Sequence, residues 1–287
     1  MSRAKSTVLF VAGVIALSLV SRVNAQPNPN RAATPPPAAR TAAPIDLTGY
    51  WVSIVTQDWR WRMVTPAKGD YEGMPLTPEG RAVADAWDPA KDEAAGEQCR
   101  SYGAPAVMYV PGRVHVTWAD DNTLKIETDA GMQTRLLHFG DYEAPPATAT
   151  DGGSAANAGA DLRPPRSWQG VWIAQWQTPR PNVPLLLRPA ARTADTPAVV
   201  PTGGSLRVAT TNLRAGYLRK NGVPYSENAV LTEYFDVYKR PNGEELLTIT
   251  TVIEDPQYLR TARLVAPVFK KEPNGAKWDP TPCSSTW

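Results

Sequence analysis

The sequence predicts a mainly β protein whose antiparallel strands form a meander that closes into a barrel or packs as a sandwich, with one or two short helices. Two observations predict this fold. Short runs rich in β-branched and aromatic residues recur along the chain and are separated by Gly, Pro, Asn and Asp. In addition, Pro-Asn-Gly at 241–243 joins two such runs and is the strongest hairpin signal in the chain.

The N-terminus has the composition of a cleavable signal peptide over residues 1–25. Arg3 and Lys5 supply a positive start, residues 7–20 form an apolar run, and small residues precede the cleavage point after Ala25. The alternative is an uncleaved anchor, but the apolar run is shorter than the roughly 20 residues that cross a bilayer. We therefore expect a periplasmic or secreted protein with no stable membrane anchor after cleavage.

Removal of the signal peptide changes the net charge. The whole chain has 30 Lys and Arg against 28 Asp and Glu, and without Arg3, Lys5 and Arg22 it has 27 basic and 28 acidic side chains. A nearly neutral chain lacks the basic surface that nucleic acids require. We therefore expect a small-molecule ligand or substrate as the partner, and no nucleic acid.

The rest of the chain divides by composition. Residues 26–45 are rich in Pro and Ala and are expected to form a disordered linker. Residues 46–287 are expected to form a single β-rich domain with a flexible insertion at 143–166, and the alternative is a domain boundary at this insertion. Cys99 and Cys283 are the only cysteines. In an oxidising compartment we expect them to form a disulfide, and two buried free thiols are the alternative.

The elements are expected in the following order. One helix begins at Pro78, capped by Thr77, and runs to Trp87 before Pro89. A three-strand meander follows at 107–118, 123–128 and 132–139. Later strands are expected at 168–177, 205–212, 229–239, 244–253 and 259–270.

Several fragments resemble the lipocalin and calycin barrels. Gly49-Tyr50-Trp51 resembles their first signature, in which the Trp packs across one end of the barrel, and Gly170-Val171-Trp172 repeats its spacing. Thr232-Glu233-Tyr234 is similar to their Thr-Asp-Tyr motif, and Arg260 or Arg263 would be the late arginine that stacks on the Trp. The resemblance implies a lipocalin-like barrel and no particular ligand, and the motifs are spaced more widely here than in an ordinary lipocalin.

The chain as a whole is similar to a group of exported bacterial proteins that begin Asp-Leu-Thr-Gly-x-Trp, here at residues 46–51. Further matching fragments are Pro224-Tyr225-Ser226 and Glu254-Asp255-Pro256. This resemblance implies an exported protein and brings no reaction with it.

Tryptophan is the unusual residue of this composition, with ten in the chain. On a strand, the alternation of Trp59-Arg60-Trp61-Arg62 would place both indoles on one face and both guanidinium groups on the other. Such a face stacks on an aromatic or apolar ligand, with Trp118 as a further wall and Arg113 and His115 as polar anchors. The alternative is that the indoles belong to the core.

The chain has two histidines, His115 and His138, and they lie on expected strands that flank the strand carrying Glu127. If the register aligns them, the three side chains share one polar face that suits general acid–base catalysis, with Tyr225 as a further partner. The same set would also suit a metal ion, and a solvent-facing stripe is the simplest alternative. We assign no metal and no cofactor.

The leading hypothesis is an exported β-barrel-like protein that binds a small apolar or aromatic molecule. One alternative is a cofactor-independent isomerase, lyase or hydratase that uses a His/Glu acid–base pair. The other is an interaction module of the cell envelope.

Overall fold

The structure is a computed structural model that describes residues 37–140, 165–178 and 203–286. The expected signal peptide, residues 26–36 of the expected linker and most of the expected insertion lie outside these ranges. The described residues belong to one compact unit that begins at Pro37. No helix within them is long and apolar enough to cross a membrane.

The protein is mainly β, as the sequence predicts. The strands of the main sheet are β1 (Gly49–Ile54), β2 (Arg113–Asp120), β3 (Thr123–Thr128), β4 (Thr134–His138), β5 (Val171–Gln177), β6 (Ser205–Thr211), β9 (Val230–Lys239), β10 (Glu245–Glu254), β11 (Arg263–Val265) and β12 (Val268–Glu272). A separate small ladder contains β7 (Gly216–Tyr217) and β8 (Pro224–Tyr225). The described helices are α1 (Trp59–Arg62), α2 (Pro78–Asp85), α3 (Pro89–Ala94), the 3₁₀ helix η1 (Gln98–Tyr102) and α4 (Ala104–Val107), more than the one or two expected.

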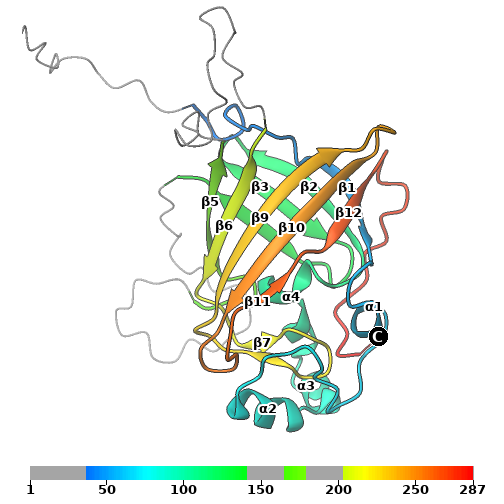
Figure 1. Cartoon of the computed structure of the whole chain (residues 1–287), viewed down its shortest axis with the longest axis vertical. Helices are drawn as coiled ribbons and strands as arrows, with labels where there is room; N and C mark the ends of the chain where they lie inside the picture. The colour runs from blue at the N-terminus through cyan, green and yellow to red at the C-terminus, as the bar shows by residue number, and fades with distance from the viewer. Residues whose placement is uncertain (1–36, 141–164, 179–202, 287) are drawn as a thin grey trace, which may run out of the picture. The chain divides into compact units, whose positions relative to one another are not determined.

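The main sheet curls into a nearly closed barrel. Its strand order is β4-β3-β2-β1-β12-β10-β9-β6-β5, with β11 paired to β10, and every neighbouring pair is antiparallel. A bridge between Phe139 and Ala174 brings the two edge strands together. The helices and the β7–β8 ladder lie at one end of this barrel (Figure 1). The barrel therefore has one end built of short helices and loops.

The local turn chemistry explains why two expected hairpins form. β2, β3 and β4 pair as the predicted meander, although β2 starts only at Arg113 because residues 104–107 form α4. β9 and β10 pair along their whole length on either side of the Pro-Asn-Gly turn, where Gly243 has a φ of +85°. The expected strand at 259–270 is interrupted before Pro267, which has no N–H to donate, and gives β11 and β12 instead.

Helix α2 begins as the sequence predicts. The Thr77 hydroxyl accepts a hydrogen bond of 3.0 Å from the N–H of Gly80, and Pro78 occupies the first helical turn. The helix ends at Asp85, two residues before the predicted end at Trp87.

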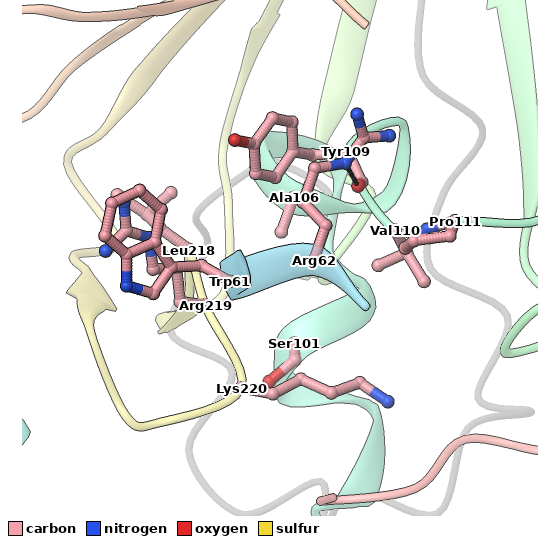
Figure 2. A pocket seen from close by; sticks show the side chains of 10 residues that line it. All are labelled: Trp61, Arg62, Ser101, Ala106, Tyr109, Val110, Pro111, Leu218, Arg219 and Lys220. Carbon is pink, nitrogen blue, oxygen red and sulfur yellow. Dashed lines mark hydrogen bonds between the residues drawn. The ribbon is translucent and has the colours of Figure 1, made fainter. Parts of the chain in front are cut away.

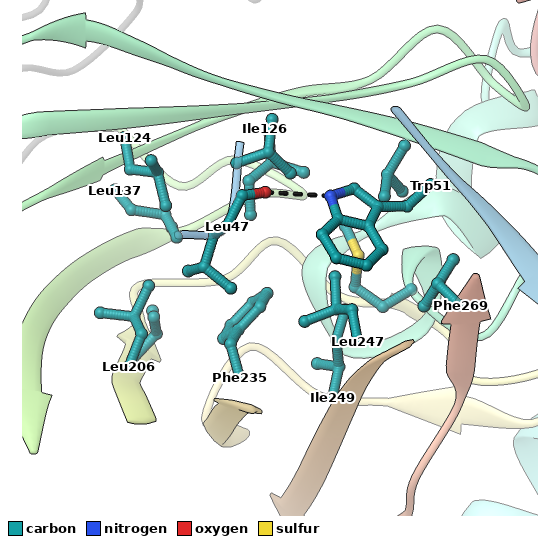
Figure 3. Packing of buried hydrophobic residues seen from close by; sticks show 14 of the residues in the cluster. Leu47, Trp51, Leu124, Ile126, Leu137, Leu206, Phe235, Leu247, Ile249 and Phe269 are labelled. Carbon is teal, nitrogen blue, oxygen red and sulfur yellow. Dashed lines mark hydrogen bonds between the residues drawn. The ribbon is translucent and has the colours of Figure 1, made fainter. Parts of the chain in front are cut away.

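Apolar side chains and one ion pair fill the interior of the barrel. The Trp51 indole lies among Leu47, Phe235 and Phe269 and donates a hydrogen bond of 2.9 Å to the Leu47 carbonyl (Figure 3). Arg135 of β4 and Glu233 of β9 are fully buried and form two hydrogen bonds, one of 2.9 Å. The side chains that point inward from these strands therefore pack against each other.

The prediction that Arg260 or Arg263 stacks on the Trp51 ring is wrong. Lys271 of β12 lies over the Trp51 ring, with its Nζ 5.1 Å from the ring centroid. The Arg263 guanidinium instead lies 5.1 Å from the Tyr109 ring centroid, and Arg260 is exposed. The reason is register, because β1 pairs with β12, so the neighbouring strand places a lysine beside the indole.

The segment before β1 is fixed to the barrel. Residues 37–45, expected in the linker, contact it through Ala39, whose N–H donates to Asn122 Oδ1 and whose carbonyl accepts from Trp176 Nε1, both at 2.8 Å.

The predicted disulfide between Cys99 and Cys283 is confirmed, with 5.1 Å between the Cα atoms. It joins η1 to the C-terminal segment.

Candidate functional site

The Trp59–Arg62 segment forms helix α1, so the predicted strand platform is wrong. Asp58 has a φ of +53°, which turns the chain away from the direction of β1. The N–H groups of Trp61 and Arg62 then donate to the Asp58 carbonyl at 2.9 and 3.1 Å and close a helical turn. As a result Trp59 is 67% exposed, whereas Arg62 is 2% exposed.

A pocket lies beside α1 at the helical end of the barrel, and we call it the basic pocket. Three segments distant in the sequence meet there, as Figure 2 shows. Its lining residues are Trp61, Arg62, Ser101, Ala106, Tyr109, Val110, Pro111, Leu218, Arg219 and Lys220. Its volume of about 20 Å³ slightly exceeds the 10–15 Å³ that one water molecule needs. The basic pocket therefore holds one small group rather than a whole drug-sized molecule.

Arg62 is fixed in the wall of the basic pocket by neutral acceptors. Its Nε donates to the Tyr109 carbonyl at 2.8 Å, and its Nη2 donates to the Ser53 hydroxyl at 3.0 Å. The guanidinium also lies 4.5 Å from the Tyr109 ring centroid. Burial lowers the pKa of Arg62 and raises the pKa of Tyr109, whose hydroxyl donates to the Asp58 carboxylate.

Arg219 reaches the basic pocket from the loop between β7 and β8. Its guanidinium lies 4.6 Å from the Trp61 ring centroid, and its Nη1 donates to the Glu72 carbonyl at 2.9 Å. Burial, and after it the charge of Arg263, lowers the pKa of Arg219 to about 10. The loop is fixed by Asn221, whose Nδ2 donates to the carbonyls of residues 67 and 70 at 3.1 and 2.9 Å.

Lys220 is the third cation of the basic pocket. Its Nζ donates to the Tyr102 hydroxyl at 2.6 Å and lies 4.5 Å from the centroid of that ring. Burial lowers the pKa of Lys220 to about 8. A cation in such a position remains able to attract an anion at neutral pH but loses its charge more readily than a surface lysine.

Exposed apolar side chains lie next to the basic pocket on and after α1. Trp59 is 67% exposed, Met63 56% and Val64 58%. Trp59 and Met63 are one helical turn apart and therefore share a face. Of the two predicted tryptophan walls in this segment, Trp61 lines the pocket and Trp59 lies on the exposed side of its helix.

The structure brings together two of the four predicted catalytic residues. His115 and Glu127 are direct partners across β2 and β3, with 3.4 Å between Nδ1 and Oε2. They lie on the outer face, because Val114 and Val116 on either side of the histidine point into the core. The Tyr50 ring stacks on His115 at a centroid distance of 4.0 Å, and Lys125 lies 2.9 Å from the same Glu127 oxygen. The pair is thus part of a polar stripe on the sheet.

The other two predicted catalytic residues lie elsewhere, so the predicted convergence is wrong. His138 pairs with Thr123, four residues from Glu127 on β3, which corresponds to about 13 Å along a strand. Its Nδ1 lies 3.0 Å from the Thr123 hydroxyl, and burial lowers the pKa of His138. Tyr225 is fully buried on β8 in a second apolar cluster at the helical end.

The remaining predicted ligand-binding residues also lie apart from the basic pocket. Arg113 forms ion pairs with Glu272 at 2.8 Å and with Asp129 at 3.9 Å. Trp118 packs against Phe139 and Trp176, with centroid distances of 5.7 and 6.4 Å. Trp118 also lines an open groove of about 420 Å³ together with Arg40, Ala43, Pro44, Ile45, Asp46 and Thr48.

Sequence reasoning missed the cations of the basic pocket. Arg62 was expected on a strand face opposite the two indoles, and Arg219 and Lys220 were not singled out. A signal was present, since Arg219-Lys220 directly precedes the Asn221-Gly222 turn, and a tight turn fixes the side chains beside it. No pattern in the sequence shows that this turn meets α1 and residues 101–111.

No protein-family model, curated protein or solved structure matches this chain. Among the residues that the structure describes, no group of three or more His, Cys, Asp and Glu side chains could hold a metal ion. The described residues form a nearly closed antiparallel barrel with a disulfide and a basic pocket at its helical end.

Proposed function

We propose that this protein is an exported binding protein that holds a small apolar or aromatic molecule at the basic pocket. Export is supported by the signal-like N-terminus and agrees with a disulfide between Cys99 and Cys283. Binding at the end of a barrel is a common arrangement in proteins of this shape.

One observation carries the proposal of a binding site: exposed apolar side chains cluster beside a pocket with aromatic walls. Trp59, Met63 and Val64 are three large, exposed apolar residues within six positions of the chain. They flank, in the sequence, Trp61, which lines the basic pocket. Single exposed apolar residues are ordinary on a protein surface, whereas a cluster beside a pocket is typical of a ligand-binding surface.

The packed interior of the barrel supports a ligand site at the basic pocket rather than in the centre of the barrel. Trp51, Phe235 and the Arg135–Glu233 pair fill the space that a lipocalin would use for its ligand. The ligand would therefore lie against the outside of α1, with one end in the basic pocket.

The alternative enzyme has less support. His115 and Glu127 form a pair, but they line neither the basic pocket nor the groove at Trp118. General acid–base catalysis requires that the substrate lies within hydrogen-bond reach of both groups.

Binding is tested by calorimetric titration with 2-naphthamide and 2-naphthoate, after the purified protein has been extracted and its co-purifying small molecules identified by mass spectrometry. We expect at least one naphthalene probe to bind, and Trp61→Ala to weaken that binding at least tenfold. Trp118→Ala is the matched control, because it removes an indole from the other groove, and it is expected to leave the affinity within twofold.

Two results would overturn the proposal. Binding that is lost in Trp118→Ala and kept in Trp61→Ala would place the ligand in the open groove. A folded protein that binds neither probe and carries no small molecule would favour the interaction module.

A further inference from the structure

Three arginines at the basic pocket are buried with few acidic partners. Arg62 and Arg219 line the pocket and are 2% and 5% exposed, and Arg263, which is 7% exposed, lies over the ring of the lining residue Tyr109. Within the described part of the chain, none of the ion pairs includes Arg62, Arg219 or Arg263. Buried charges in proteins are usually paired, so this cluster carries an excess of positive charge that needs an explanation.

The nearby carboxylates compensate only part of this charge. Asp58 raises the pKa of Arg62, Arg219 and Arg263, but its carboxylate accepts the Tyr109 hydroxyl rather than a guanidinium N–H. Asp70 also acts on Arg219, and it forms an ion pair of 2.9 Å with the exposed Arg60. Arg62, Arg219 and Arg263 therefore share the Asp58 carboxylate, which forms no ion pair with another cation in the described part of the chain.

Two N–H donors of the pocket cations are buried and have no hydrogen-bond partner: Arg62 Nη1 and Arg219 Nε. The rest of each guanidinium is fixed, since Arg62 is held by Ser53 and Tyr109 and Arg219 by the Glu72 carbonyl. Leaving a buried charged donor without a partner is destabilising, because the group loses its hydrogen bonds to water and gains none in the protein. Such donors on fixed side chains that line one pocket are typical of a site that is completed by an anionic group.

From this arrangement we propose that the ligand is an organic acid, whose carboxylate enters the basic pocket lined by Arg62 and Arg219 while its apolar body lies against Trp61. This inference rests on the proposed binding function and deepens it. The oxygens of a carboxylate accept N–H donors such as the two that are unused here. The volume of about 20 Å³ admits a carboxylate group and leaves the body of the ligand outside.

The test compares 2-naphthoate with 2-naphthamide, which has the same apolar body and no charge, by calorimetric titration of the full mature protein. We expect 2-naphthoate to bind at least tenfold more tightly than the amide. Arg219→Gln is expected to remove this preference and to leave the affinity for the amide within threefold. Arg60→Gln is the matched control: it removes the same charge from an exposed guanidinium near Trp61 that does not line the basic pocket, and it should keep the preference.

A second variant and a folding control distinguish loss of the preference for the acid from loss of the fold. Arg219→Lys retains the charge and loses the planar fork, and we expect an intermediate preference for the acid. Thermal unfolding of each variant identifies any that fails to fold.

The outcomes separate this inference from the proposed function. Equal binding of the acid and the amide, still dependent on Trp61, would overturn the organic acid and keep the binding protein. Binding of neither probe by a folded protein that carries no small molecule would overturn both. Sulfate, phosphate or chloride that binds through Arg219 when 2-naphthoate does not would also overturn the organic acid, because the site would then hold an inorganic anion.

Discussion

The buried ion pair inside the barrel gives the sharpest stability prediction. Glu233→Gln removes the carboxylate that pairs with Arg135, and both side chains are 0% exposed. Breaking one partner of a buried pair costs about 3–5 kcal/mol, because the remaining charge stays in a medium of low dielectric constant. For a domain of this size, that loss lowers the unfolding midpoint by roughly 6–20 °C.

The double variant distinguishes the cost of a broken pair from the net value of the intact one. Arg135→Met combined with Glu233→Met removes both charges and also removes Arg135 Nε, a buried N–H without a partner. We expect the double variant to lose less than about 2 kcal/mol, clearly less than the sum of the single changes.

The assay is urea unfolding monitored by tryptophan fluorescence and by circular dichroism. Glu245→Gln is the control, because it breaks the surface pairs with Lys239 and Lys271 on neighbouring strands and should cost less than about 1 kcal/mol. A loss below about 1 kcal/mol in Glu233→Gln, or a double variant as unstable as the sum of the singles, would refute the reasoning.

Four further predictions concern other parts of the molecule. Cys283→Ser should lower the free energy of unfolding by about 2–5 kcal/mol, measured by urea unfolding against the oxidised parent protein, because 184 residues separate the two cysteines. Thr77→Ala should cost about 1 kcal/mol through loss of the cap of α2, and Thr77→Ser should restore most of it in the same assay. Tyr225→Phe should raise the thermal midpoint or leave it unchanged, since the buried hydroxyl has no hydrogen-bond partner; a large loss of stability would show that the hydroxyl is needed. The pKa of Lys220 is about 8 in the folded state and its ordinary value is 10.5, so the unfolded chain binds more protons between these values and stability should rise with pH across that range. Lys220→Met should flatten this rise in unfolding curves measured from pH 7 to pH 10.

The parts of the fold that the sequence predicts are those decided by neighbouring residues. The β9–β10 hairpin depends on the Pro-Asn-Gly turn, and the start of α2 depends on Thr77 and Pro78. The pairing of His115 with Glu127 was also predictable, because consecutive strands of a meander are adjacent and only the register was open. That register, however, places His138 opposite Thr123, at the other end of β3.

The parts that the sequence does not predict depend on contacts distant along the chain. Residues 59–62 alternate as a strand would, yet the left-handed turn at Asp58 and the burial of Arg62 against Tyr109 select a helix. The basic pocket needs α1, residues 101–111 and the loop at 218–220 in one place. No local pattern encodes such a meeting, so Arg219 and Lys220 could be recognised only in the folded protein.

The position of β1 determines when the barrel can form. This first strand lies between β2 and β12, and its pairs with β12 join Tyr50 to Glu272 across most of the chain. The barrel cannot close until the last strand has been synthesised. Pairings over such long sequence separations make folding slow. The edge of β1 that awaits β12 stays unpaired until then, so the growing chain exposes a strand edge that can pair with another chain until β12 is complete.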